Sequence, residues 1–345
     1  MNDRSKRITL PPDSVMTVSV SPHIKGPETT ATIMTDVVIA LLPALGWGVY
    51  IFGLRALTLT AVSVLSCVLI ELLFCLVVRK PVTVRDLSAV VTGVLIAFGL
   101  PVNAPLWAPV AGAAFAIVVV KQLFGGIGKN IVNPAIAARV FLSLSFGFMA
   151  YFWDIGQADK LPALEVNLKV SLDAIAGATP LYGLKQGIIP ELGFFRMFLG
   201  EMGGCIGEVS ALCLLAGGIY LIWRRVITWH IPLAFIAPVA LITLVFPKGS
   251  SDTLNFALGH VFSGGLFLGA LFMATDYSTS PMTKPGKLIF GAGCGLITVF
   301  VRYFGSYPEG VSFAIMIMNL FVWYIDKATK PVKFGGPSNV RNAKK

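Results

Sequence analysis

Residues 56–78 read ALTLTAVSVLSCVLIELLFCLVV, an apolar run that contains a single acid, Glu71. A run of ~20 apolar residues is long enough to cross the ~30 Å hydrocarbon core of a bilayer as an α-helix. The whole chain shares this character: its 345 residues are 56% hydrophobic and 13% charged, and its mean hydropathy is +0.80. A soluble core does not need that much apolar surface, and barrel strands alternate over ~10 residues. The sequence therefore predicts an all-α polytopic membrane protein.

Ten membrane spans follow from the hydropathy. They cover residues 33–54, 56–78, 85–101, 106–124, 131–152, 205–223, 226–246, 254–275, 287–304 and 310–326. Five spans precede the polar segment 153–204 and five follow it, so the halves, if related, are inverted relative to each other. A shift of 180 residues pairs Pro101 with Pro281, although apolar segments can also align by chance. We expect two inverted five-helix repeats with broken, movable helices around these prolines.

The positive charges predict the orientation. Lys and Arg gather in the N-terminal segment, in alternate short loops, Lys121 among them, and in the C-terminal tail, while the opposite short loops hold few, Arg302 among them. The positive-inside rule then places both termini in the cytoplasm. The expected organisation is a cytoplasmic segment 1–32, membrane repeats 33–152 and 205–326, an outer-face loop 153–204 and a cytoplasmic tail 327–345. The net charge of +10 reflects this topology rather than nucleic-acid binding.

The sequence lacks the motifs that several kinds of binding site and catalysis require. The five cysteines form no Cys-x-x-Cys pair and the three histidines are scattered, which predicts no metal centre and no haem. No Walker motif and no dinucleotide fingerprint occurs, so we expect no ATP or NAD site in this chain. The first thirty residues contain no apolar run and predict no cleavable signal peptide.

A few acidic residues fall inside or beside the predicted spans. Glu71 lies within the second span, where an ionised carboxylate costs a few kcal/mol unless it is paired or hydrated. Asp276 closes the eighth span and Asp36 opens the first. Intramembrane ionisable groups are often functional, so Glu71 and Asp276 are candidates for an ion path. The alternatives are that Asp36 leads a helix and that Asp276 caps a turn.

Residues 125–134 read GGIGKNIVNP and place two asparagines three residues apart. Asparagine amides both donate and accept hydrogen bonds, which suits the edge of a flavin or quinone ring. The alternative is a tight cytoplasmic turn in which Asn130 or Asn133 is an N-cap and Pro134 is the first helical residue.

The polar segment contains the stretch DAIAGATPL at residues 173–181. Its Thr179 hydroxyl has small neighbours, Gly177 and Ala178, and Pro180 disfavours helix through the site. A threonine hydroxyl is a weak nucleophile that needs activation. The segment therefore presents a hydroxyl that a modifying enzyme can reach from water.

Four motifs together resemble one family in order and spacing. They are Lys129-Asn130-x-x-Asn133-Pro134, Asp173-x-x-Ala176-Gly177-Ala178-Thr179-Pro180-Leu181, Thr275-Asp276 with Ser280-Pro281-Met282-Thr283, and Arg302 with Gly305 and Tyr307-Pro308-Glu309-Gly310-Val311. The family holds RnfD, a membrane subunit of the Rnf ion-translocating oxidoreductase, and NqrB, its counterpart in the sodium-pumping NADH:quinone reductase. The resemblance covers nearly all spans, and the chain length is more similar to that of RnfD.

The resemblance implies two flavins. FMN would be joined to Thr179 by a phosphoester bond that a flavin transferase makes from FAD, with Asp173, Gly177 and Ala178 completing the motif. Ala176 stands where the family commonly has serine. A non-covalent riboflavin would lie near Asn130 and Asn133 on the cytoplasmic side.

The function implied is that of a membrane subunit in a redox-driven Na⁺ or H⁺ translocase that couples ferredoxin and NAD chemistry to ion pumping. The chain would relay electrons through a bacterial or archaeal cytoplasmic membrane and supply no catalytic side chain. Its partners would be the lipid bilayer, the flavin transferase and other subunits, including a second FMN-bearing subunit; no nucleic acid is expected. The alternatives are a urea- or ammonium-like solute channel and a scaffold that has lost its flavin.

Overall fold

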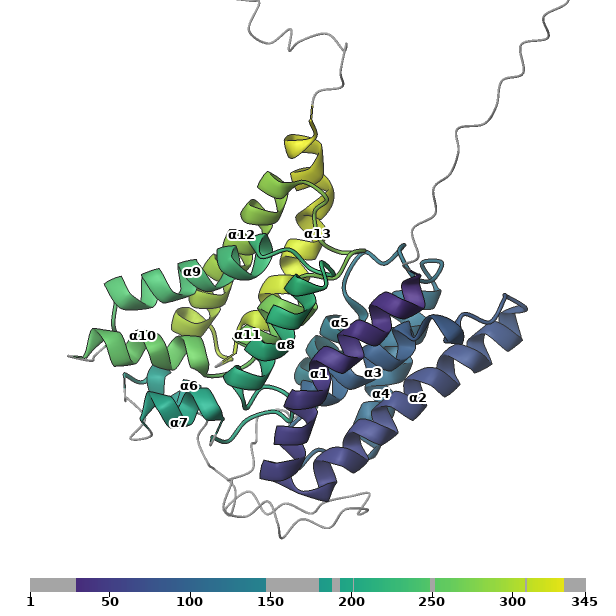
Figure 1. The fold of residues 1–345 in the computed structure, drawn as a ribbon, viewed down its shortest axis with the longest axis horizontal. Coiled ribbons are helices and arrows are strands. Elements are labelled where there is room, and N and C mark those ends of the chain that lie inside the picture. Colours follow the sequence, from purple (N-terminus) through teal and green to yellow (C-terminus); the bar gives the residue numbers. More distant parts are fainter. Residues whose placement is uncertain are drawn as a thin grey trace, which may run out of the picture.

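The computed structural model describes residues 29–146, 180–187, 193–200, 202–248, 252–307 and 309–331, and the regular elements of these ranges are helices (Figure 1). They are α1 (Thr30–Phe52), α2 (Leu54–Val78), η1 (Val84–Asp86), α3 (Ser88–Phe98), α4 (Trp107–Ala114), η2 (Phe115–Gln122), α5 (Pro134–Ser145), α6 (Pro180–Lys185), α7 (Phe194–Leu199), α8 (Ala211–Trp223), α9 (His230–Val245), α10 (Thr253–Phe262), α11 (Leu266–Leu268), η6 (Gly269–Met273), α12 (Lys284–Phe304) and α13 (Val311–Thr329). η1 is a 3₁₀ turn, and η2 and η6 are π-helical.

Each of the ten predicted spans overlaps between one and three consecutive helices. α1, α2, α12 and α13 are long and apolar enough to cross a membrane alone, and α10 with α11–η6 passes the same test as a pair bent by 56°. Shorter apolar helices, namely α3, α4–η2, α5, α8 and α9, complete the described bundle. The prediction of an all-α polytopic membrane protein is confirmed.

The two helix breaks lie at different places relative to their prolines. α3 ends at Phe98, before Gly99-Leu100-Pro101, as the sequence predicts. The second break lies between α10 and α11, where Gly264 adopts a left-handed φ of 73° that glycine tolerates best. Pro281 follows η6 in the turn before α12, so the eighth span is broken as expected, but at Gly264 rather than around Pro281.

The sixth span begins later than hydropathy predicts. α8 starts at Ala211, and the apolar residues before it pair with the chain after α3 instead of forming helix. The Ile206 N–H donates to the Leu100 carbonyl at 3.0 Å, and the Gly207 N–H donates to the Phe98 carbonyl at 3.1 Å. Non-helical backbone at membrane depth is tolerated where protein surrounds it, and Ile206 is buried.

α1 and α8 occupy equivalent places in the two halves and run antiparallel. Asp36, near the start of α1, accepts hydrogen bonds from Tyr220 and Arg224 at the end of α8. Further along α1, the Ala40 carbonyl lies against Gly217 of α8. α4 and α12, and likewise α5 and α13, also begin about 180 residues apart, as expected of repeats that share one helix order. These relations support the inverted-repeat prediction.

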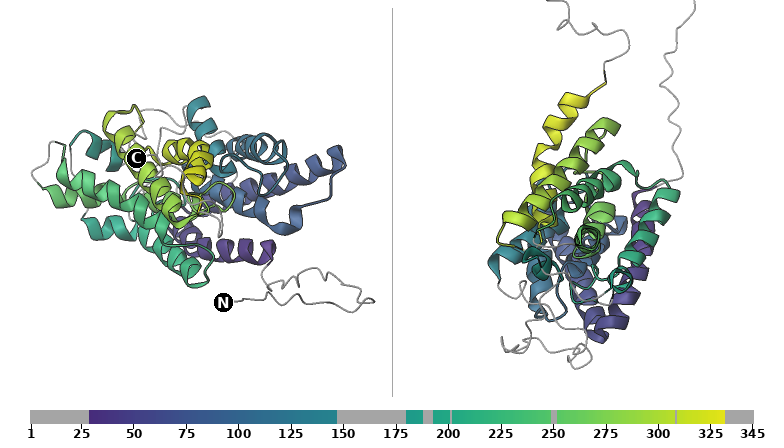
Figure 2. Two further views of the ribbon diagram at one scale, coloured as in Figure 1. Left: turned by 90° about the horizontal axis from the view of Figure 1, so that it is seen from above. Right: turned by 90° about the vertical axis from the view of Figure 1, so that its left-hand side faces the viewer.

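The bundle has two ends that matter for the site. α1 begins and α13 finishes at the same end, which we call the α1 end, while α6 and α7 lie at the opposite, α6 end (Figures 1 and 2). The predicted polar segment 153–204 is described only in part, and the termini of the predicted segments 1–32 and 327–345 lie outside the described ranges.

Replacing Gly217 with alanine should force α1 and α8 apart. A Cβ at this position would collide with the carbonyl oxygen of Ala40, and that atom cannot move unless α1 moves. Overpacking of this kind costs about 1–3 kcal/mol, so we expect Gly217→Ala to lower the melting temperature in detergent. Gly46→Ala on the exposed face of α1 is the matched control, because no described atom lies within 4 Å of its Cβ position. Equal melting temperatures for the two variants would contradict this packing.

Candidate functional site

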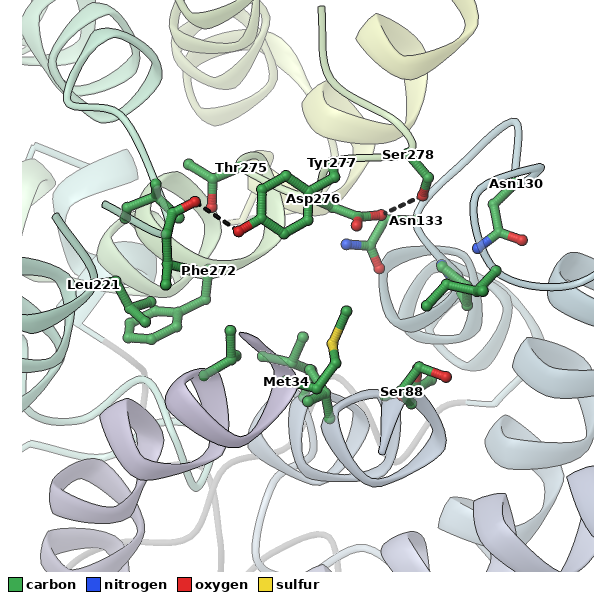
Figure 3. Close-up of a pocket in the computed structure, with 18 of the residues that line it drawn as sticks. Met34, Ser88, Asn130, Asn133, Leu221, Phe272, Thr275, Asp276, Tyr277 and Ser278 are labelled. Atoms are coloured by element: carbon green, nitrogen blue, oxygen red, sulfur yellow. Dashed lines mark hydrogen bonds between the residues drawn. The ribbon is translucent and has the colours of Figure 1, made fainter. Parts of the chain in front are cut away.

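A pocket at the α1 end gathers polar side chains from both halves of the chain (Figure 3). The first half contributes Ser88 of α3, Lys121 of η2, and Asn130 and Asn133 of the loop before α5. The second half contributes Thr275, Asp276, Tyr277 and Ser278 from the turn after η6. Apolar walls come from Met34 of α1, Leu221 of α8 and Phe272 of η6. Three residues selected from the sequence, Asn130, Asn133 and Asp276, therefore meet in one place.

Asn133 is both a helix cap and a wall of the pocket. Its Oδ1 accepts from the backbone N–H of Ala135 at 2.9 Å, with Pro134 in the first turn of α5. The N-cap interpretation of this residue is confirmed. Its Nδ2 donates to the Met273 carbonyl at 3.0 Å, which ties the start of α5 to the end of η6. Asn133 thus holds the two halves of the pocket together.

Asn130 differs from Asn133 in its bonding. The residue is 9% exposed and lines the pocket. Its Oδ1 has no hydrogen-bond partner among the described residues. A buried acceptor without a partner is rare in proteins and favours a bound donor. A ring N–H of a ligand in the pocket would satisfy this oxygen.

Asp276 lies in the turn beyond η6, where its carboxylate is held by its own loop. Its Oδ2 accepts from the hydroxyls of Ser278 at 3.0 Å and Thr279 at 3.1 Å, so the turn-capping interpretation is confirmed. Desolvation raises the pKa of the Asp276 carboxyl above its ordinary value, and these hydrogen bonds partly oppose the rise. A carboxyl that is partly desolvated at a pocket wall can still serve an ion path, so that expectation stays a prediction.

Glu71 is fully buried on α2 and is paired with a residue that the sequence analysis counted among loop charges. Lys121 Nζ donates to both oxygens of Glu71 at 2.8 Å, and Lys121 is 2% exposed. Thr83 and Gln122 donate to Glu71 Oε1 at 2.6 and 3.0 Å. Lys121 Nζ also donates to Ser88 Oγ at 2.6 Å. Because Ser88 and Lys121 line the pocket, Glu71 is connected to it through its ion pair.

A second buried charge cluster, which the sequence analysis did not anticipate, lies toward the α6 end. Arg139 of α5 forms ion pairs with Glu208, before α8, and with Glu309, before α13. Arg302 of α12 is buried beside it and donates to the carbonyls of His260 and Ser263. The charge count placed Arg302 in an outer loop. The one sequence feature that pointed to this cluster was the fourth motif of the resemblance, which contains both Arg302 and Glu309.

The flavinylation motif lies outside the described residues. This applies to Asp173, Gly177, Ala178 and Thr179. The description resumes at Pro180 with α6, which packs against α10 at the α6 end. The structure therefore brings Asn130, Asn133 and Asp276 together and connects Glu71 to them, while the chain that follows Thr179 lies at the opposite end.

The comparisons with known proteins agree with the motifs. Residues 17–335 match the NQR2, RnfD, RnfE family. The chain belongs to this family. The D-type subunit of the Na(+)-translocating ferredoxin:NAD(+) oxidoreductase complex from Acetobacterium woodii is 45% identical over 95% of this chain and 98% of its own length.

Two further relatives from this family carry related names. The D-type subunit of the proton-translocating ferredoxin:NAD(+) oxidoreductase complex from Clostridium ljungdahlii is 39% identical, over 93% of this chain and 97% of that protein. The D-type subunit of the ion-translocating oxidoreductase complex from Stutzerimonas stutzeri is 36% identical, over 88% of this chain and 91% of that protein. The similarity thus spans nearly the full length of each of these three relatives.

Removing the cation beside Glu71 should destabilise the protein. Lys121→Met leaves the carboxylate buried without its partner, a change that costs about 3–5 kcal/mol in comparable buried pairs. The double variant Lys121→Met/Glu71→Gln removes both charges and should recover much of the loss. Thermal unfolding in detergent measures both. A double variant no more stable than Lys121→Met would show that the ion pair is not the source of the effect.

Proposed function

We propose that this chain is the D-type membrane subunit of an ion-translocating ferredoxin:NAD⁺ oxidoreductase complex. The observation that carries the proposal is the 45% identity over 98% of a relative with that name. The convergence of Asn130, Asn133 and Asp276 in one pocket supports it, because these residues come from two of the motifs that the family shares. In this proposal the ferredoxin and NAD sites belong to other subunits, in keeping with a sequence that carries no dinucleotide fingerprint.

We assign covalent FMN to Thr179, through a phosphoester bond made by a flavin transferase. α6 starts one residue later and is firmly attached to the bundle: Leu181 and Leu184 are buried, and Lys185 donates to the Gly305 and Ser306 carbonyls. Such an anchor fixes the start of α6 at the α6 end, and Thr179 is its covalent neighbour. We place this end on the outer face and both termini in the cytoplasm of a bacterial membrane, in agreement with the positive-inside rule.

The residues of the α1-end pocket fit a non-covalent flavin such as riboflavin. Asn130 Oδ1 offers an unused acceptor, and the rings of Phe272 and Tyr277 line the same space. Asn133 holds the wall in place through its bond to the Met273 carbonyl. A flavin supplies one- and two-electron chemistry, and two such groups at opposite ends would let electrons cross the membrane. A second FMN-bearing subunit would exchange electrons with the flavin on Thr179.

The ion path in this proposal starts from the pocket. Glu71, Lys121 and Ser88 form a buried polar route from the pocket wall into α2, and Asp276 stands on the opposite side of the pocket. The relatives are named for Na⁺ and for proton translocation, so family membership is compatible with either ion. Coupling requires that pocket occupancy or charge favour one of two arrangements of these groups.

Replacing Thr179 tests the covalent site. When the chain is co-produced with a flavin transferase, the wild type should give a yellow fluorescent band after denaturing electrophoresis. Thr179→Val, which has the same shape without the hydroxyl, should give none, because no oxygen remains for the phosphoester. Thr179→Ser keeps the hydroxyl and should retain measurable fluorescence. A band that persists in Thr179→Val, or a wild type without one, would overturn the assignment.

Replacing Asn130 tests the pocket. Asn130→Leu removes the unpaired acceptor, and loss of one buried hydrogen bond should weaken flavin binding about tenfold or more. The measurement is the amount of flavin that acid releases from the purified complex, relative to the covalent band. Asn255→Leu on α10 is the control, because Asn255 bonds Asp252 far from the pocket. Equal release from both variants and the wild type would exclude the pocket as a flavin site.

A further inference from the structure

The cluster around Arg139 contains two carboxylates that converge on one backbone position. Arg139 donates to Glu208 Oε1 and Glu309 Oε2, and the Gly265 N–H donates to Glu309 Oε1 at 2.7 Å. A Cβ at Gly265 would collide with Oε1 of both glutamates, so the carboxylates face each other across this glycine. Gly265 precedes α11–η6, and the helix start favours negative charge there.

The charges of the cluster balance. Arg139 and Arg302 are both buried, and a guanidinium stays protonated in proteins. Glu208 and Glu309, if both ionised, compensate them. Cys205 lies within 3.6 Å of Arg139 Nη2.

Three further titratable groups border the cluster. His260 and Tyr303 adjoin Arg302, and Lys185 of α6 caps the end of α12 through the Gly305 carbonyl. His260, Tyr303 and Lys185 are therefore the titratable groups that α10, α12 and α6 bring next to the cluster.

The interior beside this cluster contains polar atoms that nothing described satisfies. Arg302 Nε and Ser263 Oγ, both in residues that are about 1% exposed, have no hydrogen-bond partner in the described part of the chain. Arg302 Nη2 and Glu309 Oε1 lie 3.5 and 3.7 Å from the same point, the Cβ position of Gly264. Buried polar groups of this kind are normally bridged by water, and water is the usual carrier of a proton between carboxyl groups.

α6 covers the cluster. Leu181 packs against Gly264, at the point that Arg302 Nη2 and Glu309 Oε1 also approach, and Leu184 packs against Gly259 of α10. Pro180 begins α6, and Thr179 is its covalent neighbour. A group carried on Thr179 is therefore tethered two residues from the side chain that closes the cluster.

We propose that Glu208 and Glu309 share one exchangeable proton, whose uptake accompanies reduction of the flavin on Thr179; this rests on the flavin assignment made above. An electron from the complex's reduced donor adds one negative charge next to a neutral cluster. A proton from water at the α6 end then forms an O–H bond on one glutamate, and reoxidation releases it. Arg139 remains paired with the other glutamate throughout.

The donors already bound favour a proton over a metal ion. Both oxygens of Glu309 and one oxygen of Glu208 accept N–H groups, and two guanidinium groups stand beside them. A hard cation requires several oxygen ligands at once, whereas a proton needs one lone pair. Glu309 is 18% exposed and Glu208 is 4% exposed, so Glu309 is the residue through which the proton enters.

The expected effect follows from Coulomb's law. With an effective dielectric constant of about 20, one charge at a separation on the order of 12 Å changes the proton affinity of a carboxyl group about tenfold, and this general case sets the size of effect to look for. For a one-electron couple, tenfold corresponds to about 59 mV. The same interaction acts in both directions, so the proton must also change the flavin potential.

The experiment uses the intact complex with Thr179 loaded. Infrared difference spectra between reduced and oxidised complex should show a protonated-carboxyl C=O band that grows on reduction. Glu208→Gln and Glu309→Gln should lose this band. In redox titrations, the pH dependence of the covalent flavin's potential should weaken in both variants, with a shift of about 59 mV between wild type and variant across the titration range.

The controls separate this proposal from the flavin assignment. Asp252→Asn neutralises an exposed carboxylate at the start of α10 and should keep both the infrared band and the pH dependence. Because both glutamate variants are measured, the proposal can still be tested if one of them does not assemble into the complex. A fluorescent Thr179 band together with an unchanged carboxyl band in Glu208→Gln and Glu309→Gln would overturn the proton site while leaving the flavin in place. Absence of the fluorescent band from the wild type would overturn both.

Discussion

A charge buried inside a membrane protein must find its counter-charge within the same bundle, and here that constraint joins the two halves of the chain. Arg139 of the first half holds Glu208 and Glu309 of the second, and Asp36 of α1 holds Arg224 of α8. The buried pairs of Arg139 add little net stability, because desolvation offsets their attraction, but breaking one is expensive. They therefore specify how the halves meet rather than how tightly they pack.

The same constraint explains which parts of the fold hydropathy could predict. Span positions depend on local apolar content, so each of the ten predicted spans overlaps helix, and the stop at Gly99-Leu100-Pro101 was readable from the turn residues. The extended pairing of residues 205–207 with residues 98–101 could not be predicted. An apolar segment has the same hydropathy whether it is helical or extended. The position of the second break, at Gly264 rather than near Pro281, was missed because a glycine pair inside an apolar run is common in membrane helices.

The candidate site was predictable in its members but not in its connections. Asn130, Asn133 and Asp276 were selected from local motifs, and the fold brings them to one pocket. Lys121 and Arg302 were assigned to loops because a charge count has no information about burial. Their partners lie far away in sequence, 50 residues in the case of Lys121 and Glu71. For Asn133 the N-cap interpretation is confirmed, because its amide oxygen caps α5 while its nitrogen bonds the Met273 carbonyl. A flavin contact of this residue stays a prediction.

The pocket at the α1 end and the cluster around Arg139 share two structural features that bear on how a redox reaction could drive ion movement. Each lies where helical backbone is interrupted, the pocket beside the turn after η6 and the Arg139 cluster beside the α10–α11 break. Each also contains a lysine or arginine that is shared between acceptors: Lys121 between Glu71 and Ser88, and Arg139 between two glutamates. A shared cation can change its preferred partner when a nearby charge changes, and a break in the helix lets backbone follow without unfolding a span. Electron arrival at either end would thus act on a cation that already contacts two acceptors, and coupling requires that the added charge favour one of two arrangements of such a group.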